Sequence, residues 1–128
     1  MKRHTVEKVV REAPFSHITE CNGVVYLAGI IAADDPELGA QPVNDIVSET
    51  ERCLLLVGKL LHHVKLDYDD VASVLVHLTD LTDFESMNQV YERFFPAGSQ
   101  PVRTCVGVSE LLQGARIEIT CVAHRAQA

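Results

Sequence analysis

The chain has 128 residues and a mass of 14.1 kDa, which is enough for one domain with a substantial core and too little for two. Hydrophobic residues make up 47% and charged residues 23%, so we expect residues 1–128 to form a single compact domain. The net charge of −7 argues against a nucleic-acid partner, because such binding depends on clustered Lys and Arg.

Apolar segments and cysteines bear on the location of the protein in the cell and on metal binding. No apolar run approaches the ~20 residues of a membrane span, and Met1 to Pro14 carries charges where a secretory signal would be apolar. We therefore expect a cytoplasmic protein with no membrane partner. The four cysteines lack Cys-x-x-Cys spacing and stand in apolar contexts, which predicts free buried thiols and no metal site; they are Cys21, Cys53, Cys105 and Cys121.

The N-terminal part of the chain predicts three strands. Apolar residues indicate a first strand over His4 to Val10. Pro14 favours extended backbone before a second strand at Phe15 to Thr19. Asn22-Gly23 is a strong hairpin signal, and the continuous apolar run of Val24 to Ile31 after it predicts a strand buried on both faces.

A loop and a long helix follow. The turn residues of Ala33 to Pro42 predict a surface loop in which the adjacent Asp34 and Asp35 are solvated, because no third ligand suggests a metal. Asn44 or Asp45 can cap a helix whose apolar positions recur at three- and four-residue spacing. These positions are Ile46, Thr50, Cys53, Leu54, Val57, Leu61 and Val64. The opposite, solvated face is expected to carry Glu49, Arg52, Lys59, His62 and His63.

The next elements are a strand and a second helix. Val71 to Leu78 predicts a buried strand in which His77 is expected to be a satisfied core or interface histidine, although its role stays open. Thr82 with Glu85 can form a capping box for a helix that Pro96 ends. Its apolar face carries Phe84, Met87, Tyr91 and Phe94, and Asn88 on that face is expected to hold a neighbouring loop.

Two further strands carry charges that neither strand needs for folding. In Val102 to Val108, alternation places Arg103 on one face with Cys105 and Gly107. In Arg116 to Val122, it places Glu118 on the face opposite the isoleucines. A guanidinium matches the two oxygens of a carboxylate, and a nearby carboxylate can orient water or transfer protons. A structural salt bridge between the two side chains is the alternative.

The order of these elements predicts an α+β fold with one six-stranded mixed sheet and both helices on one face. No remaining element can cover the other face. Self-association is the physical solution for an uncovered apolar face.

The Pro-x-Arg-Thr strand, the glycine-containing turn and the Ile-Glu strand of Pro101 to Thr120 resemble the C-terminal signature of the RidA/YjgF family. The resemblance extends over nearly the whole chain, through Pro14 to Ser16, Val25 to Gly29, Glu49 to Leu61, His77 to Phe84 and Met87 to Phe95. It implies a chorismate-mutase-like fold and a homotrimer with active sites between subunits.

The resemblance also implies an activity. Enzymes of this family, the 2-iminobutanoate/2-iminopropanoate deaminases, hydrolyse the C=N bond of 2-imino and enamino acids to 2-keto acids and ammonia, without cofactor or metal. By position, Arg103 would bind the substrate carboxylate together with the backbone N–H of Cys105, and Glu118 would position the attacking water. Gly29 would allow the backbone to approach the ligand.

Several positions depart from the family pattern. Phe15 stands where Tyr is usual and His17 where Gln or Pro is usual, and both are expected at the pocket rim, tuning substrate choice. Ile30 and Ala32 also differ, so the natural substrate stays open. One alternative is an enamine such as 2-aminomuconate, with Arg116 or a His as second cation. Another is a non-enzymatic regulatory module that binds small carboxylates, whereas ribonuclease action is disfavoured by the acidic charge.

Overall fold

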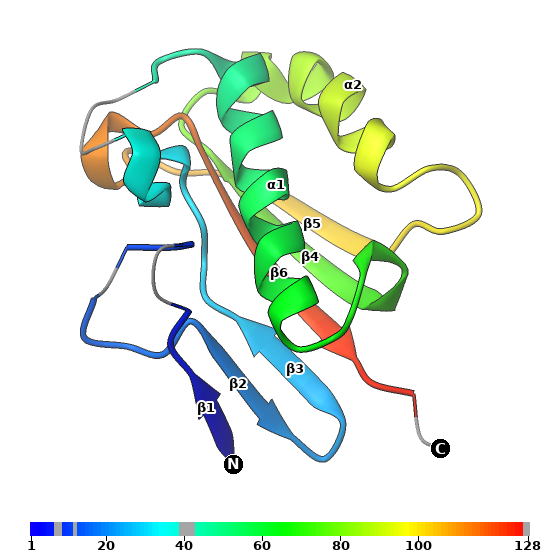
Figure 1. Ribbon diagram of the computed structural model, residues 1–128. Helices are drawn as coiled ribbons and strands as arrows, with labels where there is room; N and C mark the ends of the chain where they lie inside the picture. Colours follow the sequence, from blue (N-terminus) through cyan, green and yellow to red (C-terminus); the bar gives the residue numbers. More distant parts are fainter. Residues whose placement is uncertain (7–8, 12, 39–42, 127–128) are drawn as a thin grey trace.

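A computed structural model describes the chain apart from residues 7–8, 12, 39–42 and 127–128. One six-stranded mixed sheet is covered on one face by the helices α1 and α2 (Figure 1), which confirms the predicted fold class. The elements are β1 Lys2–His4, β2 Ile18–Cys21, β3 Val24–Leu27, α1 Ile46–His63, β4 Val71–Leu78, α2 Phe84–Phe94, β5 Val102–Gly107 and β6 Ile117–His124. The strand order is β1-β2-β3-β6-β4-β5, with β4 and β5 parallel and the other neighbours antiparallel.

The long helix α1 begins as expected. The side chain of its N-cap residue, Asp45, accepts a hydrogen bond from the backbone N–H of Ser48 at 2.9 Å. The predicted apolar positions of the helix are buried, and His62 and His63 are exposed.

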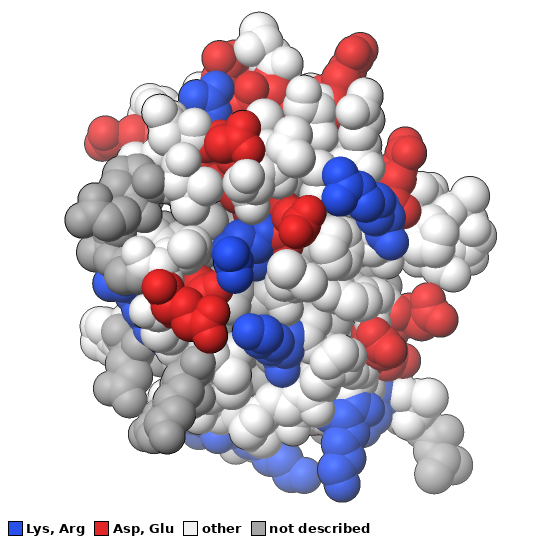
Figure 2. All heavy atoms as spheres, turned by 45° about the horizontal axis from the view of Figure 1, so that its top comes forward, with Lys and Arg blue, Asp and Glu red and all other residues white. Residues whose placement is uncertain are grey.

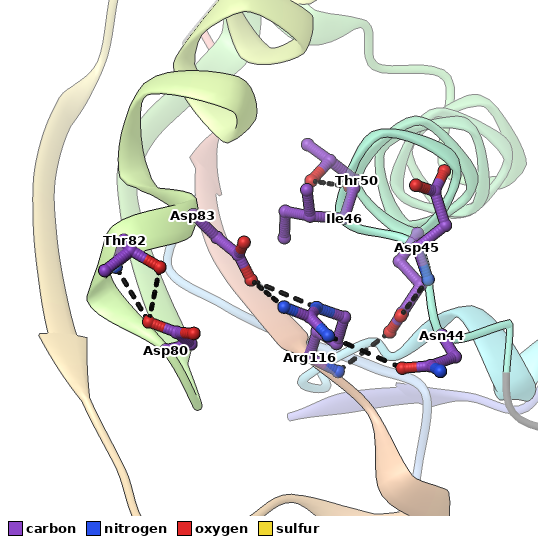
Figure 3. A network of polar contacts seen from close by, with 9 residues as sticks. Asn44, Asp45, Ile46, Thr50, Asp80, Thr82, Asp83 and Arg116 are labelled. Atoms are coloured by element: carbon purple, nitrogen blue, oxygen red, sulfur yellow. Dashed lines mark hydrogen bonds and ion pairs between the residues drawn. The ribbon is translucent and has the colours of Figure 1, made fainter.

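Glu49 corrects the prediction for the other face of α1. It is 2% exposed, and its carboxylate accepts hydrogen bonds from the backbone N–H groups of Arg116 at 2.9 Å and Asp45 at 3.1 Å. Burial raises the pKa of Glu49, because desolvation disfavours the charged form. The Arg116 side chain continues the junction by donating to Asp83 at 3.1 Å (Figure 3), so this network joins α1, α2 and the start of β6.

The start of α2 differs from the predicted capping box. Asp80 accepts hydrogen bonds from both the backbone N–H and the hydroxyl of Thr82, which closes a short 3-10 turn at Leu81–Asp83 ahead of the helix. The N-cap residue of α2, Asp83, makes no side-chain hydrogen bond that caps the helix. Thr82 therefore lies within this 3-10 turn and does not cap α2.

The N-terminal strands are shorter than predicted. β1 spans Lys2–His4, and part of the predicted segment His4 to Val10 lies outside the described residues. Asn22 and Gly23 take φ values of 51° and 82° in the tight turn between β2 and β3, which confirms the hairpin. Tyr26 in β3 is 47% exposed, so the expectation of burial on both faces is wrong for the single chain.

The loop before α1 is less solvated than expected. Asp35 is 2% exposed and accepts a hydrogen bond from Arg52 at 2.9 Å, while Asp34 accepts one from the backbone N–H of Ile31 at 2.9 Å. Within the described ranges, no three His, Cys, Asp or Glu side chains gather as metal ligands, and no helix is long and apolar enough to cross a bilayer. The four cysteines are free thiols as predicted, but only Cys53 and Cys121 are buried, so the expected burial is wrong for Cys21 and Cys105.

The face of the sheet opposite the helices is uncovered. It carries exposed apolar side chains, among them Tyr26 on β3 and Val102 and Val106 on β5. β1 and β5 are the two edge strands of the sheet.

Candidate functional site

Arg103 and Glu118 lie on opposite faces of the sheet. Arg103 is paired in register with Val74 of β4, whose side chain is buried under the helices. Glu118 is paired with His77, three residues further along the same strand. Because strand side chains alternate between faces, an odd separation places them on opposite sides. The alternative of a salt bridge between them is therefore not formed within one chain.

The first side chain lies in what we call the arginine half-site, formed by Arg103 of β5 and the residues of α2 that hold it. The guanidinium of Arg103 donates a hydrogen bond to the side-chain oxygen of Asn88 at 2.7 Å. Its central carbon lies 4.7 Å from the ring centroid of Tyr91 and 5.4 Å from that of Phe84. Asn88 was expected to hold a loop, and it holds the arginine instead.

A cavity of ≈ 360 Å³ opens beside Arg103. It is lined by Asn88, Tyr91, Glu92, Gln100, Pro101 and Arg103. Burial raises the pKa of Tyr91 to about 12, so its phenol stays neutral beside the guanidinium. Arg103 forms no ion pair with the described residues. The arginines that do so are Arg52, Arg93, Arg116 and Arg125.

Cys105 is two residues along β5, on the same face as Arg103. Burial raises the pKa of its thiol, which keeps the sulfur protonated and a poor nucleophile. The thiol of Cys105 is therefore not a candidate nucleophile.

The second charged side chain lies in what we call the glutamate half-site. A cavity of ≈ 330 Å³ is lined by Phe15, Ala28, Gly29, Ile31, Asp34, Leu112 and Glu118. A Cβ atom on Gly29 would stand 3.0 Å from Cδ and 3.1 Å from Oε2 of Glu118, so a larger residue here would require the carboxylate to shift by a few tenths of an ångström. Paired backbone hydrogen bonds of 2.9 and 3.0 Å between Ile30 and Ile119 hold the glycine segment against β6.

The surroundings of Glu118 are partly polar. Its side chain is 30% exposed, and Oε1 lies 3.3 Å from Nδ1 of His77. That nitrogen is buried and makes no hydrogen bond within the described part of the chain, so the expectation of a satisfied histidine is wrong. Burial raises the pKa of Asp34 at the other side of the cavity.

The two residues expected at the pocket rim differ in position. Phe15 is 56% exposed and lines the glutamate half-site. His17 is fully buried, and both of its ring nitrogens are hydrogen-bonded. Nδ1 accepts a hydrogen bond from the backbone N–H of Val6 at 2.8 Å, and Nε2 donates one to the backbone oxygen of Arg11 at 2.9 Å. The expectation of His17 at the rim is thus corrected: in this chain it fastens the N-terminal segment.

The remaining predicted positions differ in whether they line a cavity. Ile30 and Ala32 are buried, whereas Ile31 between them lines the glutamate half-site. Arg116 lines neither cavity, because it is engaged by Asp83 at 3.0 Å. Asp34 and Leu112 were missed by the sequence reasoning, since loops far apart in the chain bring them to Glu118.

The chain is similar in sequence to a known protein family and to several named proteins. The profile of the family described as "Endoribonuclease L-PSP" matches residues 5–125. The chain is 34% identical over 110 residues to "Reactive Intermediate Deaminase A, chloroplastic" of Arabidopsis thaliana, covering 86% of this chain and 58% of that protein's length. It is 30% identical over 110 residues to the "2-iminobutanoate/2-iminopropanoate deaminase" of Mus musculus, covering 86% and 80% of the two chains.

Solved structures show the same fold. A putative endoribonuclease from Thermotoga maritima superposes with a TM-score of 0.90 at 29% identity, covering 99% of this chain and 100% of the other. The crystal structure of E. coli TdcF with bound serine gives a TM-score of 0.87 at 26% identity, covering 98% and 100%.

Proposed function

Because the chain belongs to the endoribonuclease L-PSP family, which is the YjgF/RidA family, we propose that it hydrolyses 2-imino and enamino acids to 2-keto acids and ammonia. The observation that carries the proposal is the arrangement of Arg103 and Glu118. One supplies a cation and the other a carboxylate, each beside its own cavity. These are the two groups that the hydrolysis of a carboxylate-bearing imine requires.

The proposed active site is formed between two copies of the chain. Arg103 and Glu118 lie on opposite faces of one sheet, so one chain does not present both to a single small ligand. The uncovered apolar face supplies a surface for association. We propose a homotrimer of about 42 kDa, three times the chain mass of 14.1 kDa, in which the arginine half-site of one copy meets the glutamate half-site of the next.

In the binding step, Arg103 takes the substrate carboxylate. Asn88 and the ring of Tyr91 fix the guanidinium, so little side-chain freedom is lost when the ligand binds. β5 is an edge strand, which leaves backbone N–H groups available, and that of Cys105 is the proposed second donor.

In the chemical step, Glu118 holds a water molecule against the imine carbon. The imine reacts as its protonated iminium form: the oxygen of the water bonds to that carbon, the C=N electron pair moves to nitrogen, and Glu118 accepts one proton of the water, which leaves a neutral carbinolamine. Glu118 then returns this proton to the carbinolamine nitrogen. The C–N bond breaks and ammonia leaves, while the hydroxyl proton passes to Glu118 as the carbonyl forms. An iminium carbon is already electrophilic, so positioning supplies most of the rate.

The family description also names an endoribonuclease, and the charge distribution does not favour that activity here. On the face drawn in Figure 2, Lys and Arg are interspersed with Asp and Glu. The whole chain carries a net charge of −7. Binding of a polyanion depends on clustered cations that release counterions.

An ammonia-release assay with imines generated in situ from several amino acids tests the activity. We expect hydrolysis faster than the spontaneous reaction, and 2-keto acid as the second product. Binding of a keto acid without hydrolysis would instead identify a carboxylate-binding regulatory module. Sedimentation tests the assembly, since a stable monomer at micromolar concentration would contradict a site shared between copies.

A further inference from the structure

His77 is the least explained polar residue near the glutamate half-site. It lies on β4 between Glu118 of β6 and Val106 of β5, on the uncovered face of the sheet. Its Nδ1 is buried and lacks a hydrogen-bond partner among the described residues, although Oε1 of Glu118 is 3.3 Å away. The neighbour on the β5 side, Val106, offers no polar side chain. Glu118 is therefore the partner that lies within reach of a proton on this nitrogen.

The two oxygens of Glu118 face different surroundings. Oε2 lies toward Gly29, where a Cβ atom would stand only 3.1 Å from it, and Gly29 lines the cavity. Oε1 lies toward His77. A donor on Oε1 would fix the plane of the carboxylate and leave Oε2 free for a ligand in the cavity. A base that is itself oriented by a third group is a recurring arrangement in active sites.

We propose that His77 is a positioning residue, which donates its Nδ1–H to Oε1 of Glu118 and so presents Oε2 to the attacking water. The inference rests on the proposed function, because it assigns a role toward the water held by Glu118. His77 itself lines neither cavity, and it acts through Glu118 alone. It should therefore affect the chemical step and leave carboxylate binding at Arg103 unchanged.

Variants of His77 test this role in the full-length protein. His77→Phe keeps a ring and removes the donor, and we expect kcat to fall about tenfold with KM unchanged. His77→Asn places an amide N–H near the position of Nδ1, and should restore kcat to within about threefold of the wild type. Wild-type kcat in a folded His77→Phe variant, or a His77→Asn variant as slow as His77→Phe, would overturn the proposal.

A second histidine supplies the matched control. His62 lies 3.5 Å from Asp67 in a similar histidine–acid pair, but both side chains are exposed and line neither cavity. His62→Phe should leave both kcat and KM unchanged. Equal losses of kcat in the His62 and His77 variants would show a general effect of removing a histidine and contradict the positioning role.

Nitrogen NMR tests the contact without relying on activity. In the wild type, the neutral ring of His77 should carry its proton on Nδ1, and in Glu118→Ala it should move to Nε2. The same tautomer in both proteins would overturn the inference, even if imines are hydrolysed. If the tautomer changes but no imine is hydrolysed, the contact stands and the proposed function fails.

Discussion

The arginine and glutamate half-sites differ in how completely one chain builds them. Arg103 is fixed by a 2.7 Å hydrogen bond to Asn88 and lies against the ring of Tyr91. Glu118 is 30% exposed, and Oε1 of its carboxylate lies 3.3 Å from the buried Nδ1 of His77. The single chain thus fixes Arg103, the proposed carboxylate-binding residue, on the helix side of the sheet. The group proposed to act on water stands on the uncovered side.

Subunit complementation gives the largest expected effect. Arg103→Ala and Glu118→Gln should each lower kcat/KM by about 100-fold or more, because each removes one half of every site. When the two variants are unfolded, mixed in equal amounts and refolded, about one quarter of the wild-type activity should return. Each site then takes an intact arginine from half of the copies and an intact glutamate from half of their neighbours.

The control is each variant refolded alone, which should stay inactive. Mass spectrometry of the intact assembly confirms that mixed trimers have formed. If mixed trimers form and activity does not return, the two residues do not meet across an interface.

Replacing Arg103 by Lys tests the binding half by itself. The charge remains, but the fork of donors that matches a carboxylate is lost. We expect the affinity for pyruvate to fall by about 2 kcal/mol, roughly thirty-fold, as measured by titration calorimetry. Glu118→Gln should change this affinity little. An Arg103→Lys variant that binds pyruvate as the wild type does would remove Arg103 from the site.

Asn88 is expected to contribute to pyruvate affinity, because it holds the guanidinium of Arg103. In Asn88→Ala the guanidinium loses its hydrogen bond, and pyruvate affinity should fall roughly twenty-fold, within the range for hydrogen bonds to charged groups. Gln89→Ala is the matched control, since Gln89 is the exposed neighbour on the same helix. Equal affinities in the two variants would show that the preparation of Arg103 does not depend on Asn88.

The smallest effect concerns the rim of the glutamate half-site. Phe15→Tyr adds a hydroxyl beside the cavity and should shift relative rates among imines by about tenfold, or 1.4 kcal/mol. His17→Leu should lower the melting temperature without changing the order of substrates, because His17 is buried and bonded within the N-terminal segment. An unchanged rate order in Phe15→Tyr, across a panel of imines, would place Phe15 away from the ligand.

The sequence predicted the main elements because their periodicity follows directly from burial. The spacing along α1 located its buried positions, and alternation placed Arg103 and Cys105 correctly on one face of β5. What alternation does not give is the register between strands. The opposite placement of Arg103 and Glu118 became visible only when both were paired to β4.

Buried polar residues were the other source of error. Glu49 and Asp35 were expected at the surface, because charged side chains are normally exposed. In the structure, backbone N–H groups bind Glu49 and Arg52 binds Asp35. These partners come from segments distant in sequence, so local pattern carries no signal for them.

The two edges of the sheet have unequal consequences for solubility. β1 is three residues long and exposes Lys2 and Arg3, features that discourage pairing with another strand. β5 is six residues long and exposes Val102. Fibre growth by strand addition needs two receptive edges on every molecule. With one edge short and charged, we expect such growth to stop early, so that an apolar edge is compatible with the proposed trimer without polymerisation into amyloid-like stacks.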